Sequence, residues 1–127
     1  MNPILDQKGN TVAYLYNKLL LDVKLQKVKG VVLGNCVFGH KAEPVGKFFN
    51  NTFRNLYGDI VAVSNSQYNH EPVINQLDIL NGAWKILMEI KTHECTWIPE
   101  NNEWSDQSFS EFLAARELAY EPESMFA

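Results

Sequence analysis

The sequence predicts a mainly β protein: a fourfold-repeated antiparallel β-hairpin domain followed by a C-terminal α-containing extension, α+β overall. Three observations support this prediction. A unit of about 16 residues recurs four times, side chains alternate within each unit, and helical spacing begins only near residue 73. A repeat of fixed length indicates one supersecondary unit that is used several times. We therefore expect a fourfold β-repeat domain at 4–64 and an acidic, aromatic-rich extension at 65–127.

The repeat is defined by residues that match at offsets of 16, 17 and 16. After the first matched valine, Ala13 and Tyr14 are expected to point to opposite sides, because side chains alternate along a β-strand. The most regular column of the alignment holds a valine in every unit: Val12, Val28, Val45 and Val61.

Each unit is expected to contain two kinds of turn. Asn and Gly tolerate positive φ, so they favour tight hairpin turns at Asn17-Lys18, Gly34-Asn35 and Asn50-Asn51. The one extra residue of the second unit is expected near Gly34-Asn35, as a bulge or a three-residue loop. Gly9 and Gly58 mark the other kind of turn.

Closure of the four units into a ring is a hypothesis at this level. Eight strands in a row leave two exposed sheet edges unless the sheet closes on itself. Ala13, Gly46 and Ala62 share a column, and such small residues favour strands that crowd around a common axis. Lys29 breaks this column in the second unit.

Four units of the form Leu-Asp-x-x-Gly-x-x-Val-Ala/Gly resemble the bacterial 4-fold beta flower domain family. The matching segments are Ile4–Gly9, Pro44–Gly46 and Arg54–Gly58, and Trp104-Ser105 with Ser108–Leu113 resembles the usual ending of that family. Units two and three depart from the pattern, because Leu25 and Ala42 stand in place of the turn glycine. The resemblance implies a fold and no assigned activity.

The segment 73–91 can be interpreted as a helix or as a hairpin. Asn81-Gly82 in its middle is a strong hairpin signal, and a glycine inside a helix costs about 1 kcal/mol. We predict a break at Asn81-Gly82 with a helix after it. The residues that recur at helical spacing are Val73, Leu77, Leu80, Trp84, Leu87 and Lys91.

The final element is expected to be a helix over about 108–120. Ser108 and Glu111 have the spacing of a capping box, which marks a helix N-terminus. One face of this helix is expected to pack on the β-domain. That face consists of Phe109, Phe112, Leu113, Arg116 and Tyr120.

Charge and composition exclude several classes of protein. Residues 1–66 carry a net charge of +4 and residues 67–127 a net charge of −8, so the acidic part is expected beside the basic part. A charge of +4 is modest for a nucleic-acid surface, and no nucleic-acid partner is expected. No apolar run approaches the ~18 residues of a membrane helix, and the start lacks the features of a signal peptide. With two cysteines and no disulfide framework, we expect a cytoplasmic protein without membrane contact.

Four residues have the ligand types of a tetrahedral zinc site: Cys36, His40, His93 and Cys95. Their spacing is not that of a zinc motif, and structural roles for Cys36 in a strand and His40 in a turn are favoured. Cys95 with His93 or His70 has the residue types of an activated thiol, but no oxyanion motif accompanies them. No metal, cofactor or catalytic residue is therefore assigned.

Three further groups have a functional and a structural interpretation. Asp6, Asp22 and Asn55 share a column and have the oxygen ligands of a calcium site, but Asx residues also cap turns, which is favoured. The column Lys8, Lys24 and Lys41 is interpreted as solvated turn tips rather than an anion site. Trp84, Trp97 and Trp104 are candidates for an interaction surface, although anchoring of the extension is favoured for them.

The sequence favours a non-catalytic protein-interaction or scaffold module that associates with a protein partner or with itself. The reason is a regular β framework with an aromatic-rich extension and no catalytic constellation. The alternative is a small-ligand or metal-binding domain, with hydrolytic activity based on Cys and His residues.

Overall fold

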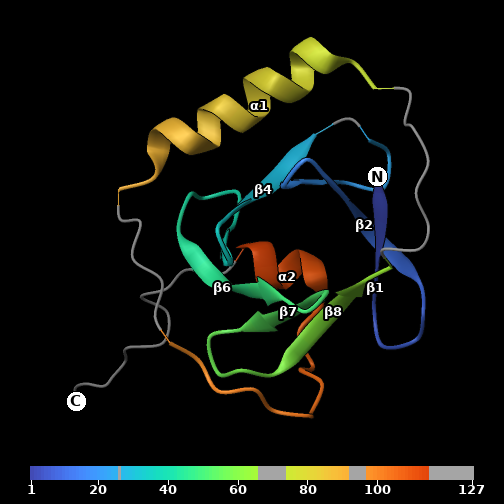
Figure 1. Ribbon diagram of the computed structural model, residues 1–127. Helices are drawn as coiled ribbons and strands as arrows, with labels where there is room; N and C mark the ends of the chain where they lie inside the picture. Colours follow the sequence, from blue (N-terminus) through green and yellow to red (C-terminus); the bar gives the residue numbers. More distant parts are fainter. Residues whose placement is uncertain (26, 66–73, 92–96, 115–127) are drawn as a thin grey trace.

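The computed structural model describes residues 1–25, 27–65, 74–91 and 97–114 (Figure 1). Eight antiparallel strands follow one another in chain order and close into a barrel. The two helices, α1 (Gln76–Glu89) and α2 (Phe109–Ala114), come after the barrel. The strands are β1 (Asn2–Leu5), β2 (Thr11–Tyr16), β3 (Leu19–Leu21), β4 (Val28–Leu33), β5 (Cys36–Phe38), β6 (Pro44–Phe49), β7 (Thr52–Asn55) and β8 (Ile60–Ser64).

The ring closes where β1 meets β8. Ile4 pairs with Ser64 and Leu5 with Val63, so neither terminal strand leaves an exposed edge there. The closure that the sequence left as a hypothesis is therefore present, and the α+β fold class is confirmed.

Tight two-residue turns join the strands at one end of the barrel. The flanking pairs are Tyr16↔Leu19, Leu33↔Cys36 and Phe49↔Thr52, which leave two residues in each loop. Both loop residues of the first and third turns have positive φ, as the type I′ geometry requires. The predicted turn positions are confirmed, but the extra residue of the second unit is not at Gly34-Asn35.

The extra residue of the second unit lies in the turn between β3 and β4, at the other end of the barrel. In the first unit the N–H of Asp6 donates to the carbonyl of Asn10, whereas in the second the N–H of Asp22 donates to Lys27, one residue further along the chain. The four turns are otherwise alike. Each has a 2.9–3.0 Å backbone bond over three residues: Gly9→Asp6, Leu25→Asp22, Ala42→Gly39 and Gly58→Asn55.

This register corrects the columns of the repeat. Strand pairing places Thr11, Val28, Pro44 and Ile60 at equivalent positions. Lys29 therefore takes the place of the valine, and Gly30 completes the small column with Ala13, Gly46 and Ala62. The alignment on valine was wrong by one residue in the second unit, because side-chain similarity favoured Val28 whereas the hydrogen bonds place the insertion before it.

Close packing explains the small column. A Cβ built on Gly46 would lie 1.9 Å from the carbonyl oxygen of Arg54, and one on Gly30 would lie 2.6 Å from that of Phe38. The barrel interior is filled by a buried apolar cluster that includes Ile4, Leu20 and Phe53, each 0% exposed. It is a packed core and not a channel.

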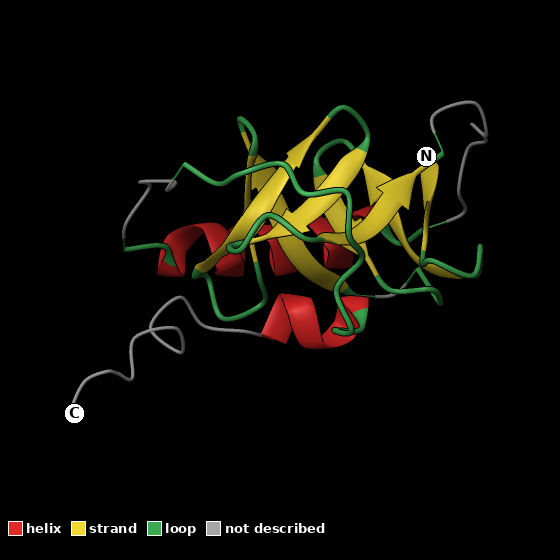
Figure 2. Cartoon of the chain, turned by 90° about the horizontal axis from the view of Figure 1, so that it is seen from below, coloured by secondary structure: helices red, strands yellow, loops and turns green. Residues whose placement is uncertain are grey.

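Helix α2 closes the end of the barrel that carries the four similar turns (Figure 2). Phe109, Phe112 and Leu113 are buried in the same cluster as the barrel interior. The predicted capping box is present, with Ser108 N donating to Glu111 Oε1 at 2.9 Å and Glu111 N donating to Ser108 Oγ at 3.0 Å. Docking of this helix face is confirmed for these residues, whereas Arg116 and Tyr120 lie outside the described residues.

Helix α1 lies on the outside of the barrel (Figure 1). It runs without a break through Asn81-Gly82, so the predicted break is wrong. The side chain of Asn75 caps its start by accepting the N–H of Asp78 at 3.2 Å. Ile79, Ala83 and Ile86 are buried on one helix face. A Cβ on Gly82 would make an ordinary 3.5 Å contact with Val28, and burial of this face outweighs the ~1 kcal/mol propensity cost of the glycine.

The segment 97–105 runs beside the fourth repeat unit. Ile60 N donates to Glu103 O and Ser105 N donates to Ile60 O, both at 2.8 Å, and Trp104 bridges to Ile60. The buried guanidinium of Arg54 donates to the carbonyls of Gly58 and Asn101 and so links the turn to this segment. A Cβ on Gly58 would lie 2.2 Å from the Pro99 carbonyl oxygen, which requires glycine at this contact.

Candidate functional site

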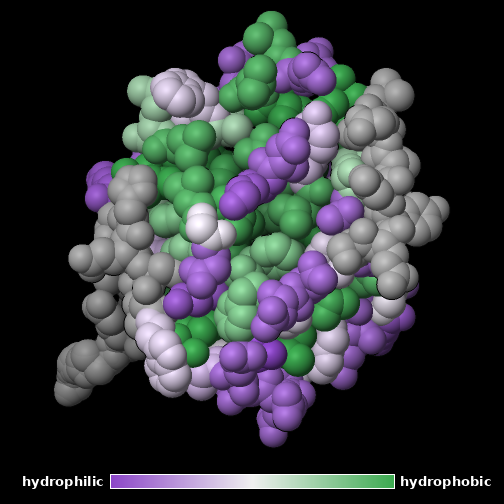
Figure 3. Space-filling view, viewed as in Figure 1, coloured by the Kyte–Doolittle hydropathy of each residue, from purple (hydrophilic) through white to green (hydrophobic). Residues whose placement is uncertain are grey.

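The exposed side of α1 carries an apolar stripe. Leu77, Leu80, Trp84 and Met88 are 68%, 62%, 63% and 69% exposed. We call these four residues the outer face of α1. Figure 3 shows apolar and polar side chains interspersed along the upper edge of the molecule, over this helix. Large apolar side chains that gather on one exposed face mark interaction sites more often than isolated ones do.

The outer face is almost opposite the docked face. At ~100° per residue, the four exposed side chains fall within an arc of about 80°, and their mean direction is about 140° from the mean direction of Ile79, Ala83 and Ile86. Helix α1 is therefore apolar on two sides, of which the barrel covers one. Leu77, Leu80 and Trp84 of this second side belong to the face predicted from helical spacing, whereas Leu87 of that predicted face packs toward the barrel and Met88 was not predicted.

Asp78 and Lys85, which carry opposite charges, flank the outer face on the side that also holds Glu89. Asp78 and Lys85 are exposed and lie about 100° and 80° from Leu77 around the helix axis, on the same flank. They are seven residues apart, so about 10 Å of helix rise separates them. Neither forms an ion pair with another residue in the described part of the chain.

The three tryptophans have different environments. Trp84 and Trp97 are 63% and 78% exposed, so the anchoring interpretation is wrong for both. Trp104 is half-buried beside β8, where its backbone pairs with Ile60. Trp84 belongs to the outer face of α1, and Trp97 precedes the buried Ile98 on a separate segment.

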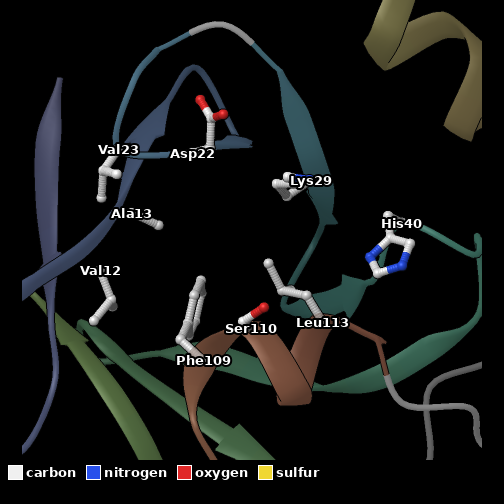
Figure 4. A pocket seen from close by; sticks show the side chains of 9 residues that line it. All are labelled: Val12, Ala13, Asp22, Val23, Lys29, His40, Phe109, Ser110 and Leu113. Atoms are coloured by element: carbon white, nitrogen blue, oxygen red, sulfur yellow. The ribbon is translucent and has the colours of Figure 1, made fainter.

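A pocket of about 170 Å³ lies between the barrel and α2 (Figure 4). Its walls are mostly apolar, and the polar side chains on it come from the second and third repeat units and from α2. The lining residues are Val12, Ala13, Asp22, Val23, Lys29, His40, Phe109, Ser110 and Leu113.

His40 is the titratable group of this pocket whose pKa is clearly displaced. Although His40 is exposed as a whole, partial desolvation of its imidazole lowers its pKa below 6.5, and the nearby charges of Lys29 and Lys41 lower it further. The lowered pKa favours the neutral imidazole at pH 7, which can accept a proton or a hydrogen bond. Lys29 lies beside this pocket because of the inserted residue in the second turn, which moves it to the position of the valine.

The pocket brings Ser110, His40 and Asp22 to one site, but not as a catalytic triad. Figure 4 shows Asp22 and His40 on opposite sides of Lys29. A nucleophile and its base must lie within hydrogen-bond distance of each other. No hydrogen bond joins Ser110 to His40 within the described residues.

Cys36 and His40, the described members of the zinc candidate, lie in different surroundings. Cys36 is 4% exposed, packs with Phe38 and Ile86 between the barrel and α1, and is in a disulfide. His40 is exposed in the turn that follows β5, where it lines the pocket beside α2. The described residues hold no group of three His, Cys, Asp or Glu side chains that could bind a metal ion. His93, Cys95 and His70 lie outside the described residues, so the zinc-site and activated-thiol hypotheses that include them remain hypotheses.

The turn columns have structural roles. Asp6 Oδ1 accepts the N–H groups of Lys8 and Asn10 at 3.0 and 2.9 Å. Asn55 Oδ1 accepts those of Tyr57 and Asp59 in the same way. The oxygens that would bind a cation are thus used to cap the turns. Lys8, Lys24 and Lys41 are exposed at the turn tips, as predicted.

Sequence reasoning missed the pocket and the two-sided character of α1. The position of Lys29 on the pocket follows from the insertion, which a valine-based alignment conceals. The buried face of α1 could have been found, because Ile79, Ala83, Ile86 and Ile90 also recur at helical spacing.

Comparison with known sequences identifies the family. The sequence model of the family described as 4-fold beta flower protein matches residues 2–113, which takes in all eight strands and α1. No match is found among curated proteins or among solved structures. In the part of the chain that the structure describes, no helix is long and apolar enough to cross a membrane. Four similar hairpin units closed into one barrel agree with the family match, and the chain belongs to the 4-fold beta flower protein family.

Proposed function

We propose that this protein is a non-catalytic interaction module that binds a protein partner through the outer face of α1. The observation that carries the proposal is the exposure of Leu77, Leu80, Trp84 and Met88 on one side of a helix whose other side is already docked. Amphipathic helices of barrels need one apolar side to pack, so a second apolar side has no role in the fold itself. An amphipathic helix face is also a common means of protein recognition.

Site-specific photo-cross-linking in cells tests the proposal. A photoreactive amino acid replaces Trp84 in one variant, Leu80 in a second and Lys8 in a control, because Lys8 is exposed on a barrel turn away from α1. We expect one adduct, identified by mass spectrometry, from positions 84 and 80 but not from position 8. Adduct yields at 84 and 80 no higher than at the control position would overturn the proposal.

The predicted compartment is the cytoplasm, and the disulfide at Cys36 provides its test. Disulfides persist in oxidising compartments and are rare in the cytosol. Alkylation of thiols in intact cells before lysis measures the state of the two cysteines of the sequence. Modification of both cysteines would support a cytoplasmic location, whereas a disulfide that stays unmodified would contradict it.

The pocket favours a second candidate function, the binding of a small apolar ligand with an acidic group. Val12, Phe109 and Leu113 supply apolar walls, and Lys29 supplies a positive charge at the side. Titration with medium-chain fatty acids, followed by amide NMR shifts, tests this function. We expect shifts around Ser110 and His40 that decrease in Lys29→Gln, and their absence would exclude such ligands.

A further inference from the structure

The outer face of α1 has a symmetry in its residue order. The midpoints of the pairs Leu77 with Met88, Leu80 with Trp84, and Asp78 with Lys85 all fall between residues 81 and 83. A twofold axis that crosses the helix near this point would place each residue opposite the other member of its pair in a second helix. A C2 interface is self-complementary in this sense, because residue i contacts j and j contacts i.

From this symmetry we infer that the partner of the outer face is a second copy of this chain, with the two α1 helices packed antiparallel around an axis near Asn81-Gly82. The inference rests on the proposed function and names its partner. In this arrangement Leu80 packs against Trp84 of the other copy, and Leu77 packs near Met88. Exposed apolar side chains on both helices are thereby removed from water together.

Charge supports the antiparallel direction. In an antiparallel pair with this axis, each flank of one helix faces the same flank of the other. Asp78 and Lys85 share a flank, so each copy places its Asp78 beside the Lys85 of the other copy, twice per dimer. In a parallel pair this flank would face the opposite flank of the partner, which holds Gln76 and Leu87 and no charge to pair with it. Complementary charges across an interface set the register and the orientation.

The barrel leaves the outer face accessible to a second copy. The four apolar side chains and both charged residues are exposed in the presence of the barrel, and the docked face of α1 points the other way. Helix α1 spans 14 residues, or about 21 Å, so Leu77 and Met88 lie near its two ends. The symmetric stripe thus extends along almost the whole helix.

A pair of charge reversals tests the arrangement on the full chain. Asp78→Lys gives a flank with two lysines beside Glu89, and Lys85→Asp gives a flank with two aspartates beside Glu89. Each variant alone should dimerise at least about tenfold more weakly than the wild type, because like charges face each other twice. Mixing the two variants should restore association, because every lysine then faces an aspartate. As a control, Lys8→Asp makes the same charge change as Lys85→Asp, but on a barrel turn, and it should leave the dissociation constant unchanged.

Sedimentation velocity over a concentration series up to about 1 mM measures the dissociation constants. Trp84→Ser should weaken dimerisation by about tenfold or more, as expected for a central aromatic contact. A wild-type protein that stays monomeric throughout would overturn the inference, and so would charge variants that fail to recover on mixing. If the monomer still cross-links through position 84 to a different protein, the interaction module stands and its partner is not a second copy. If there is no dimer and no adduct, both proposals fail.

Discussion

Replacement of Gly46 by alanine tests the packing of the barrel axis. The added Cβ would lie 1.9 Å from the Arg54 carbonyl oxygen and 2.8 Å from Cε1 of Phe112, a side chain that is 0% exposed. The first contact is with backbone in the neighbouring strand β7, so relief requires β6 and β7 to separate. Gly46 does not have positive φ, so its backbone conformation does not by itself strain an alanine.

Overpacking of this kind costs typically 1–3 kcal/mol, and a clash with backbone belongs at the upper end, at about 3 kcal/mol. Small domains are stable by only about 5–15 kcal/mol, so the loss is a large fraction of the total. For a chain of this size it corresponds to a fall in Tm of about 10 °C. Gly82→Ala is the matched control, because its Cβ meets Val28 at 3.5 Å within a helix. It should stabilise the protein by about 1 kcal/mol.

Urea unfolding followed by far-UV circular dichroism measures both variants. A midpoint for Gly46→Ala equal to that of the wild type would refute the reasoning, because it would mean that β6 and β7 are further apart than described. A loss of stability in Gly82→Ala similar to that in Gly46→Ala would also refute it. Any substitution of glycine would then be damaging, and the barrel axis would have no special role.

Three further predictions concern the turns, the extension and the pocket. Lys18→Gly should stabilise the protein by about 0.5–1 kcal/mol in urea unfolding, because Lys18 has φ 68° in a two-residue turn, and Asn17→Gly should gain less since asparagine tolerates this conformation. Arg54→Met should cost about 3 kcal/mol, because the carbonyls of Gly58 and Asn101 lose a buried charged donor, and an unchanged midpoint would contradict this role. NMR titration of His40 should give a pKa below 6.5 that rises in Lys29→Gln, and a value above 6.5 would contradict the effect of burial and of the two lysines on this imidazole. Because the unfolded chain takes up this proton at the higher pH, the contribution of His40 to stability should decrease as the pH falls below 6.5.

The repeat, the turns and the final helix could be predicted from the sequence because their signals are local. Asn17-Lys18 and Ser108 with Glu111 determine their own geometry through φ preferences and a reciprocal pair of hydrogen bonds. The position of the insertion could not be predicted, because strand pairing shows where it lies and residue similarity does not. The continuity of α1 through Gly82 depends on burial against Val28, a contact between segments distant in the chain. The pocket combines Lys29, His40 and Ser110 from three segments, and no spacing in the sequence relates them.

The inserted residue in the second turn has a consequence for how the extension finds its place. Four identical hairpins would offer four equivalent outer sides, and a helix could then dock in any of four orientations with equal free energy. The longer turn makes one side different. Leu25 on that turn and Val28 directly after it lie in the apolar cluster that receives Ile74 and Ile79 of the α1 segment. The insertion thus adds to the sequence differences among the four units, and together these differences give α1 one docking orientation.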